Sequence, residues 1–248
     1  MKDEESLTSQ NVRESYEFLA KKVLEDHAKN YSRIILNFHN EIVRQQFKLS
    51  YADLANLDLL YYEALKLDGL GFKGRAAVNE AFDAVCHLKE EKPETMMNFW
   101  KSLMVCFSEL EDVERQLFCT NEASYLATRM NREEEAVALK KDVIALAYRF
   151  EQPYLSQHLP TFEELILQFG AIKGKELFAY EKETPKVIHD PVETNPFYVR
   201  FIDKVNERLH DYFEKNPKEF SEQKFNMLKR RYLKEEGLLW SPPKQNDE

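Results

Sequence analysis

Apolar residues recur every three or four positions along most of the chain, and this spacing constrains the fold more than any other feature. One series begins at Tyr16, Leu19 and Val23, and another includes Trp100 and Leu103. Such residues lie on one face of an α-helix, whereas a half-buried strand alternates apolar and polar residues. Runs of β-branched residues between turn signals are absent from the sequence. The sequence therefore predicts an all-α protein without a sheet, with helix over more than about 65% of its residues.

The longest predicted helix runs from Asn11 to Lys48. Asn11 and Glu14 have the spacing of a capping box, in which two side chains satisfy free backbone donors of the first turn. Because this helix is unusually long, we expect an irregular multi-helix bundle in which shorter helices pack around it. Further helices are predicted to follow Ser50, Gly74, Lys92, residue 120, Met130, Thr161, residue 196 and residue 217.

Glycine and proline mark the predicted boundaries. Three of the six glycines fall in LDGLGFKG, residues 67–74, which is the clearest break between helices. Three prolines fall in KETPKVIHDPVETNP, residues 182–196. The sequence therefore predicts a main helical domain over 11–181, a proline-containing linker over 182–196, and a C-terminal helical pair over 197–240 that packs on the main domain.

The charge of the chain argues against a general nucleic-acid binder. The formal net charge is −9, whereas such proteins spread Lys and Arg over one face. The segment 224–236 is a local exception, because its cations would form the solvated side of an amphipathic helix. Contact with nucleic acid is therefore expected only through a local patch. Its members are Lys224, Lys229, Arg230, Arg231 and Lys234.

We expect a cytoplasmic protein that makes no membrane contact. The first ten residues, MKDEESLTSQ, are acidic and polar, which is not the pattern of a secretory signal. No apolar run approaches the roughly 18 residues that a membrane helix needs. Cys86, Cys106 and Cys119 lie among apolar helical residues, which predicts buried thiols in a reducing compartment.

Neither a cofactor nor a metal ion is expected. The six glycines form no phosphate-binding loop, and the three cysteines do not have the spacing of a zinc site. Glu80 and His87 lie seven residues apart on one predicted helix face, but two ligands do not make a site.

His39 is the first candidate for a functional side chain. It lies between Ile35 and Ile42, at the border of the predicted buried stripe. A histidine at such a border can be an acid–base or ligand group, or a half-buried residue that makes a structural hydrogen bond. We expect His39 to lie near Arg75 or the 67–74 loop, and the pair to matter more for folding than for chemistry.

Arg33 and His39 also offer an enzymatic alternative. The segment RIILNFH resembles the Arg-x(4–6)-His pattern of HEPN-type ribonucleases, in which the arginine would stabilise phosphate charge and the histidine would move a proton. Six residues along a regular helix rotate by about 240°, so the two side chains do not share a face. Ile34 also replaces the polar residue that this family tends to have. A helical nuclease centred on Arg33, His39 and Arg75 is therefore the alternative to a binding protein.

Two short stretches resemble a second family. FHNEIV at 38–43 and GRAA at 74–77 are similar to the HN-x-IV and GR-x-A-F segments of phage abortive-infection proteins of bacteria. PTFEELILQFGAIKG at 160–174 is similar to a later segment of that family. Val78 departs from the pattern, since the family has Phe at this place. The resemblance carries over onto His39, Asn40, Ile42, Val43, Gly74, Arg75 and Ala77.

The resemblance implies a role in phage defence and no known reaction. His39 and Asn40 would face Arg75, either as a site or as a polar network between two helices. Aromatic residues make up 12% of the chain, and such residues commonly anchor protein interfaces. We therefore expect an interaction or regulatory protein in phage defence, with a protein partner or a second copy of the chain. An enzyme should hold its polar groups in one cleft, whereas an adaptor should expose apolar surface.

Overall fold

Helices dominate the part of the chain that the structure describes. The structure is a computed structural model that describes residues 8–88, 91–150, 159–180 and 187–245. Helical residues of all types make up 78% of this part, which confirms the all-α class. Within these ranges, the regular strands are two residues long: β1 (Val187–Ile188) pairs antiparallel with β2 (Lys244–Gln245). No larger sheet forms in the described residues.

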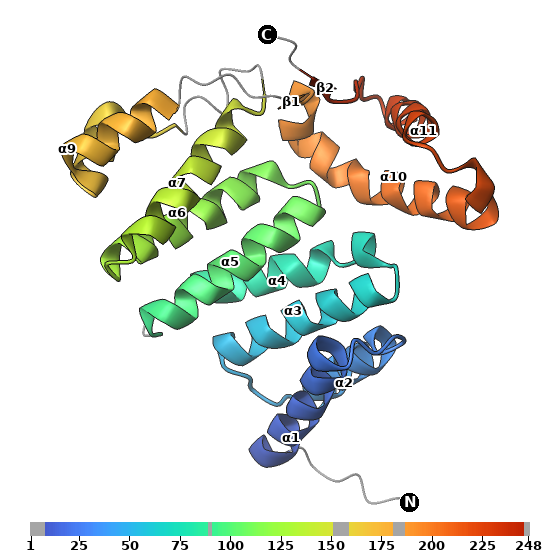
Figure 1. Ribbon diagram of the computed structural model, residues 1–248. Helices are drawn as coiled ribbons and strands as arrows, with labels where there is room; N and C mark the ends of the chain where they lie inside the picture. Colours follow the sequence, from blue (N-terminus) through green and yellow to red (C-terminus); the bar gives the residue numbers. More distant parts are fainter. Residues whose placement is uncertain (1–7, 89–90, 151–158, 181–186, 246–248) are drawn as a thin grey trace, which may run out of the picture. The chain divides into compact units, whose positions relative to one another are not determined.

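The chain divides into two compact units, Met1–Glu90 and Glu91–Glu248. The first unit contains α1 to α4 and the second contains α5 to α11 (Figure 1). The α-helices of the first unit are α1 (Ser9–Ala20), α2 (Ser32–Arg44), α3 (Tyr51–Leu67) and α4 (Arg75–Cys86). Those of the second unit are α5 (Pro93–Glu109), α6 (Val113–Arg129), α7 (Glu133–Tyr148), α9 (Phe162–Tyr180), α10 (Pro196–Lys215) and α11 (Glu222–Glu235).

The division differs from the predicted one. The boundary between the units falls inside the segment 11–181, and the C-terminal helical pair belongs to the second unit. Of the predicted linker, residues 182–186 lie outside the described part of the chain. The remainder forms β1 and a 3₁₀ turn (Pro191–Thr194), in which Glu193 and Thr194 are buried.

The prediction of one helix from Asn11 to Lys48 is wrong, because the chain leaves the helical conformation between α1 and α2. A π-helical turn follows α1, and His27 and Asn30 then have φ angles of 48° and 65°. Right-handed helices cannot continue through such residues. The carboxylate of Asp68 accepts hydrogen bonds from the backbone N–H groups of Asn30 and Ser32, and so fixes the start of α2. The apolar spacing simply continues across this break.

Five helices end in the same type of turn. A residue with positive φ follows α2, α3, α5, α6 and α11, and the next N–H group bonds to the carbonyl oxygen five residues back. This is the Schellman motif, which satisfies carbonyl groups at the end of a helix. The turn after α5 separates this helix from α6, and no glycine marks the break. The positive-φ residues are Gln46, Gly69, Glu111, Asn131 and Gly237.

The core of the first unit is built around α3. This helix packs on α2 and on α4, and seven of its residues are buried, including the polar Asp58. Gly74, just before α4, is required by this packing, because a Cβ atom there would collide with the ring of Tyr62. α3 is therefore the central helix of the first unit, and α2 and α4 pack against it.

In the second unit, Glu111 joins the C-terminal helices to the turn between α5 and α6. Its carboxylate accepts hydrogen bonds from Tyr198 Oη at 2.6 Å and from Lys229 Nζ at 2.7 Å. Burial acts to raise the pKa of Glu111, but the charge of Lys229 and these hydrogen bonds outweigh it and lower the pKa. Lys229 is 6% exposed and lies over the ring of Trp240.

This network corrects the predicted cationic patch. Lys229 is buried in the core of the second unit and cannot contact a nucleic acid. Lys224 pairs with Glu219, and Arg231 pairs with Glu235. The apolar face of α11 packs against α10, as the amphipathic pattern predicted. The patch that remains is therefore weaker in charge than the sequence suggested.

The cysteines follow the prediction at two of three positions. All three are free, and Cys106 and Cys119 are buried. Cys86 is exposed, so the prediction is wrong there, because this residue ends α4 outside the buried face of that helix. Among the helices in the described ranges, none combines the length and apolar character needed to cross a bilayer.

We predict that Glu111→Ala lowers the free energy of unfolding of the second unit by about 3–5 kcal/mol, because Lys229 would stay buried without a carboxylate. Adding Lys229→Met should recover much of this loss, since the uncompensated buried charge is then removed. Both tryptophans, Trp100 and Trp240, lie in this unit, so urea denaturation followed by tryptophan fluorescence measures its stability. Unchanged stability of Glu111→Ala would contradict the role given to this ion pair.

Candidate functional site

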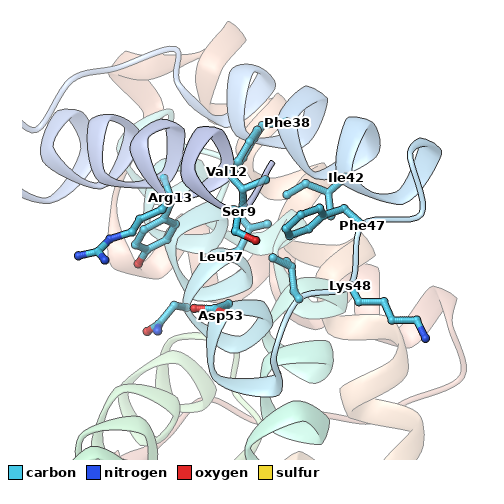
Figure 2. Close-up of a pocket in the computed structure, with 12 residues that line it drawn as sticks. Ser9, Val12, Arg13, Phe38, Ile42, Phe47, Lys48, Asp53 and Leu57 are labelled. Atoms are coloured by element: carbon cyan, nitrogen blue, oxygen red, sulfur yellow. The ribbon is translucent and has the colours of Figure 1, made fainter. Parts of the chain in front are cut away.

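The first unit contains an apolar pocket between α1, α2 and α3. Its volume is about 270 Å³ (Figure 2). The segment after α2 forms one wall, because Phe47, Lys48 and Leu49 line the pocket directly after the turn at Gln46. Phe47 and Leu49 of this returning segment contact the core of the unit. The remaining apolar lining residues are Val12, Tyr16, Phe38, Ile42 and Leu57.

Polar side chains form the rim of the pocket. Arg13 makes an exposed ion pair with Glu17, with 2.8 Å between Arg13 Nε and Glu17 Oε1. The hydroxyl group of Ser50 donates a hydrogen bond to Asp53, and Asp53 donates its backbone N–H group to Ser50 Oγ. These bonds cap the start of α3, the helix that the sequence predicted to follow Ser50. Lys48 extends from the rim, and among the described residues it has no ion-pair partner.

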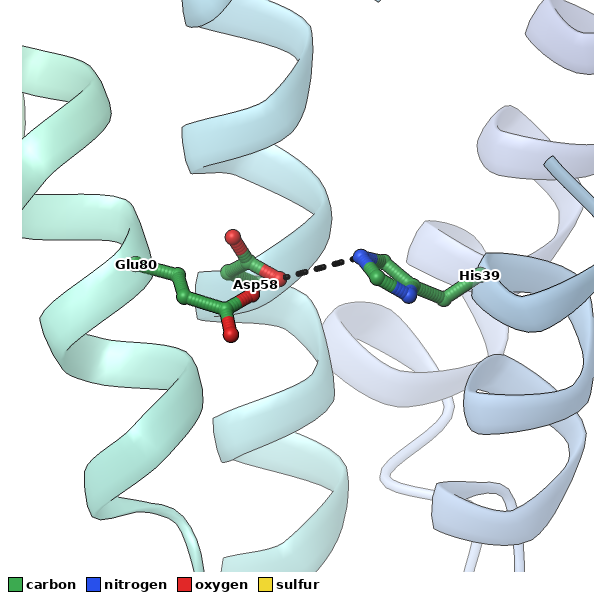
Figure 3. A group of neighbouring side chains, drawn as sticks. All are labelled: His39, Asp58 and Glu80. Atoms are coloured by element: carbon green, nitrogen blue, oxygen red, sulfur yellow. Dashed lines mark ion pairs between the residues drawn. The ribbon is translucent and has the colours of Figure 1, made fainter. Parts of the chain in front are cut away.

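A cluster of ionisable side chains shares helices α2 and α3 with the pocket. His39 of α2, Asp58 of α3 and Glu80 of α4 each bring one potential ligand atom to it, and these three atoms lie within 4.8 Å of one another. His39 Nε2 is 3.8 Å from Asp58 Oδ1, which makes an ion pair when His39 carries a proton. Figure 3 shows the carboxylate of Asp58 between the other two side chains.

Asp58 is the unusual member of the cluster. Its side chain is 4% exposed, and Oδ2 has no hydrogen-bond partner within the described part of the chain. Burial, together with the smaller effect of the nearby charge of Glu80, raises the pKa of Asp58 to about 7. A buried polar atom without a partner costs about 1–3 kcal/mol. The cluster therefore carries an electrostatic cost that a proton or a cation could offset.

The predicted site residues do not all meet. His39 is half-buried in the cluster, whereas Asn40 and Arg33 are exposed on α2. Arg75 is half-buried at the start of α4. His39 has a different partner from the predicted Arg75 or 67–74 loop, namely the carboxylate of Asp58.

Sequence reasoning missed Asp58 and did not connect Glu80 with His39. Glu80 was considered only with His87, which stacks on Tyr51 and bonds to a backbone carbonyl group. A signal for Asp58 was present, because it lies in the run LDLL, at a position that the helical spacing places among buried residues. A carboxylate at such a position is rarely buried without a function or a partner.

Comparisons with known proteins returned no match: no family model, no curated protein and no solved structure corresponds to this chain.

The raised pKa of Asp58 predicts a pH-dependent stability. In metal-free buffer, the folded protein holds a proton that the unfolded chain releases between about pH 4 and pH 7. Stability should therefore fall as the pH rises through this window and be lowest above it. Asp58→Asn should remove this dependence and stabilise the first unit by about 2–4 kcal/mol at pH 8.

Urea denaturation followed by far-ultraviolet circular dichroism at pH 5 and pH 8 measures this effect. Asp83→Asn is the matched control, because Asp83 is an exposed aspartate on α4 and its substitution makes the same change in charge. Equal pH dependence in wild type and Asp58→Asn would show that Asp58 does not bind the proton.

Proposed function

We propose that this chain is a cytoplasmic interaction protein that binds a partner segment in the apolar pocket of its N-terminal unit, and that it acts in bacterial phage defence. The pocket between α1, α2 and α3 is the observation that carries the proposal. It offers a concave apolar surface with polar groups at its rim, which is the usual form of a binding site.

The size of the pocket favours a side chain over a larger ligand. An apolar cavity of about 150 Å³ holds a benzene-sized group, whereas pockets for drug-sized ligands usually have about 300–1,000 Å³. A volume of about 270 Å³ therefore suits one large aromatic or aliphatic side chain. Anchors of this kind supply most of the binding energy in many protein interfaces.

The charged side chains at the rim of the pocket determine which charge the partner segment should carry. Among the cations of the rim, Lys48 is exposed and has no ion pair in the described residues, whereas the charge of Arg13 is shared with Glu17. The carboxylate of Asp53, the acidic group of the rim, accepts the hydrogen bond of the Ser50 hydroxyl group. An acidic residue next to the apolar anchor would complement Lys48 and favour the encounter with the partner. The expected partner segment is therefore an apolar anchor flanked by Asp or Glu.

The setting in phage defence rests on the resemblance to abortive-infection proteins. The residues of that resemblance include His39 and Asn40 on α2 and Arg75 on α4. In the structure, α2 also supplies Phe38 and Ile42 to the pocket. The segment FHNEIV would then serve to build a binding surface and its supporting core.

The alternative of a HEPN-like ribonuclease requires Arg33 and His39 to act on one phosphate group. Arg33 is exposed, whereas His39 is half-buried with Nε2 3.8 Å from Asp58 Oδ1. Six residues within α2 turn these two side chains about 240° apart. The arrangement of α2 therefore favours the interaction function over this nuclease.

Selection from a displayed library of random peptides tests the proposal without knowledge of the host. Wild-type protein should enrich peptides with one aromatic or large aliphatic residue flanked by Asp or Glu. Lys48→Glu should shift the flanking preference to Lys and Arg, because it reverses the exposed charge at the rim while leaving the apolar lining unchanged.

The matched control is Lys21→Glu, which makes the same charge change at an exposed residue outside the pocket lining. This variant should keep the acidic preference of wild type. The proposal fails if no peptide is enriched, or if the peptides enriched by wild type bind Lys48→Glu with undiminished affinity.

A further inference from the structure

Three helices converge on one point with side chains that can bind a metal ion. His39, Asp58 and Glu80 are far apart in sequence, yet their ligand atoms lie within 4.8 Å of one another (Figure 3). An imidazole nitrogen and two carboxylate groups are all ligands of zinc and related ions. The cluster differs from an ordinary surface group of acidic residues, because one member is histidine and another is buried.

Asp58 gives independent support for a cation at this point. Its side chain is 4% exposed, and Oδ2 has no hydrogen-bond partner among the residues described. Glu80 places a second carboxylate beside it, so two negative groups face each other in a partly buried position. A divalent cation beside Asp58 Oδ1 would neutralise this buried carboxylate and cancel the repulsion from Glu80.

We propose that His39, Asp58 and Glu80 bind a divalent first-row transition-metal ion, with Zn²⁺ as the reference ion. The imidazole ligand favours such ions over Mg²⁺ and Ca²⁺, which prefer sites made of oxygen ligands. Three protein ligands leave a coordination position for water, as in open zinc sites. This inference uses other side chains than the peptide pocket and does not depend on the proposed function.

The geometry requires only a small adjustment on binding. Ligand atoms that each lie about 2.1 Å from an ion can be at most about 4.2 Å apart. In a tetrahedral site two such atoms lie about 3.4 Å apart, and the three atoms of the cluster all lie within 4.8 Å of one another, so no pair must close by more than about 1.4 Å. Glu80 is exposed and can rotate inward, whereas Asp58 is held by the core around α3. Asp58 is therefore the fixed ligand and Glu80 the mobile one.

Isothermal titration of the metal-free full chain with Zn²⁺ tests the proposal. Wild type should bind one Zn²⁺ at this site, and His39→Gln and Glu80→Gln should each weaken its affinity at least tenfold. The expected loss follows from the removal of one of only three protein ligands. Because His39 is half-buried and Glu80 exposed, neither substitution removes a core side chain.

The matched control is His87→Gln. His87 is an exposed histidine of the same unit that lies outside the cluster, and its substitution should leave the affinity unchanged. At one Zn²⁺ concentration, the Tm should also rise more for wild type and His87→Gln than for Glu80→Gln, because an ion that binds only the folded state stabilises it in proportion to its affinity.

Three results would overturn the assignment. The first result is that the wild-type protein binds Zn²⁺ no more tightly than Glu80→Gln does. The second is a loss of affinity in His87→Gln as large as in His39→Gln. The third is binding of Mg²⁺ or Ca²⁺ as tight as that of Zn²⁺, which would exclude a transition-metal site.

Discussion

The ends of the helices must satisfy their last carbonyl groups, and the rest of the structure depends on how they do so. Five helices use one turn geometry, with a residue of positive φ just beyond the helix. After α5, this residue is Glu111, so the turn also presents the carboxylate that holds α10 and α11. After α2, the turn directs Phe47 into the pocket. Helix termination thus positions both the interior ion pair and the candidate binding surface.

Local signals in the sequence predicted helix starts better than helix ends. Ser50 and Thr161 cap the helices predicted to follow them, because a cap is decided by residues three positions apart. The capping box predicted at Asn11 and Glu14 is wrong, because Thr8 caps α1 one turn earlier. Helix ends were predicted only where glycine marked them. Gln46, Glu111 and Asn131 adopt positive φ without being glycine, which costs about 1–2 kcal/mol each and must be offset by tertiary packing. Such packing cannot be read from spacing, so helices were predicted too long.

The candidate site was only partly predictable for the same reason. His39 was identified because the border of an apolar stripe is visible in the sequence. Its partners, Asp58 and Glu80, come from two other helices, and their meeting depends on how α2 and α4 pack on α3. Asn40 and Arg33 share the local sequence of His39 but face solvent. The residues next to His39 in the sequence are therefore not its partners in the folded protein.

The pocket and the ionisable cluster are built from consecutive residues. α2 contributes Phe38 to the pocket and His39 to the cluster, and α3 contributes Leu57 and Asp58 in the same way. Consecutive residues on a helix point about 100° apart, so the two features lie on neighbouring sides of the same pair of helices. An ion that ties α2 to α3 and α4 would hold one wall of the pocket in place. Binding free energies are reciprocal, so a partner that needs this wall in place would in turn strengthen binding of the ion.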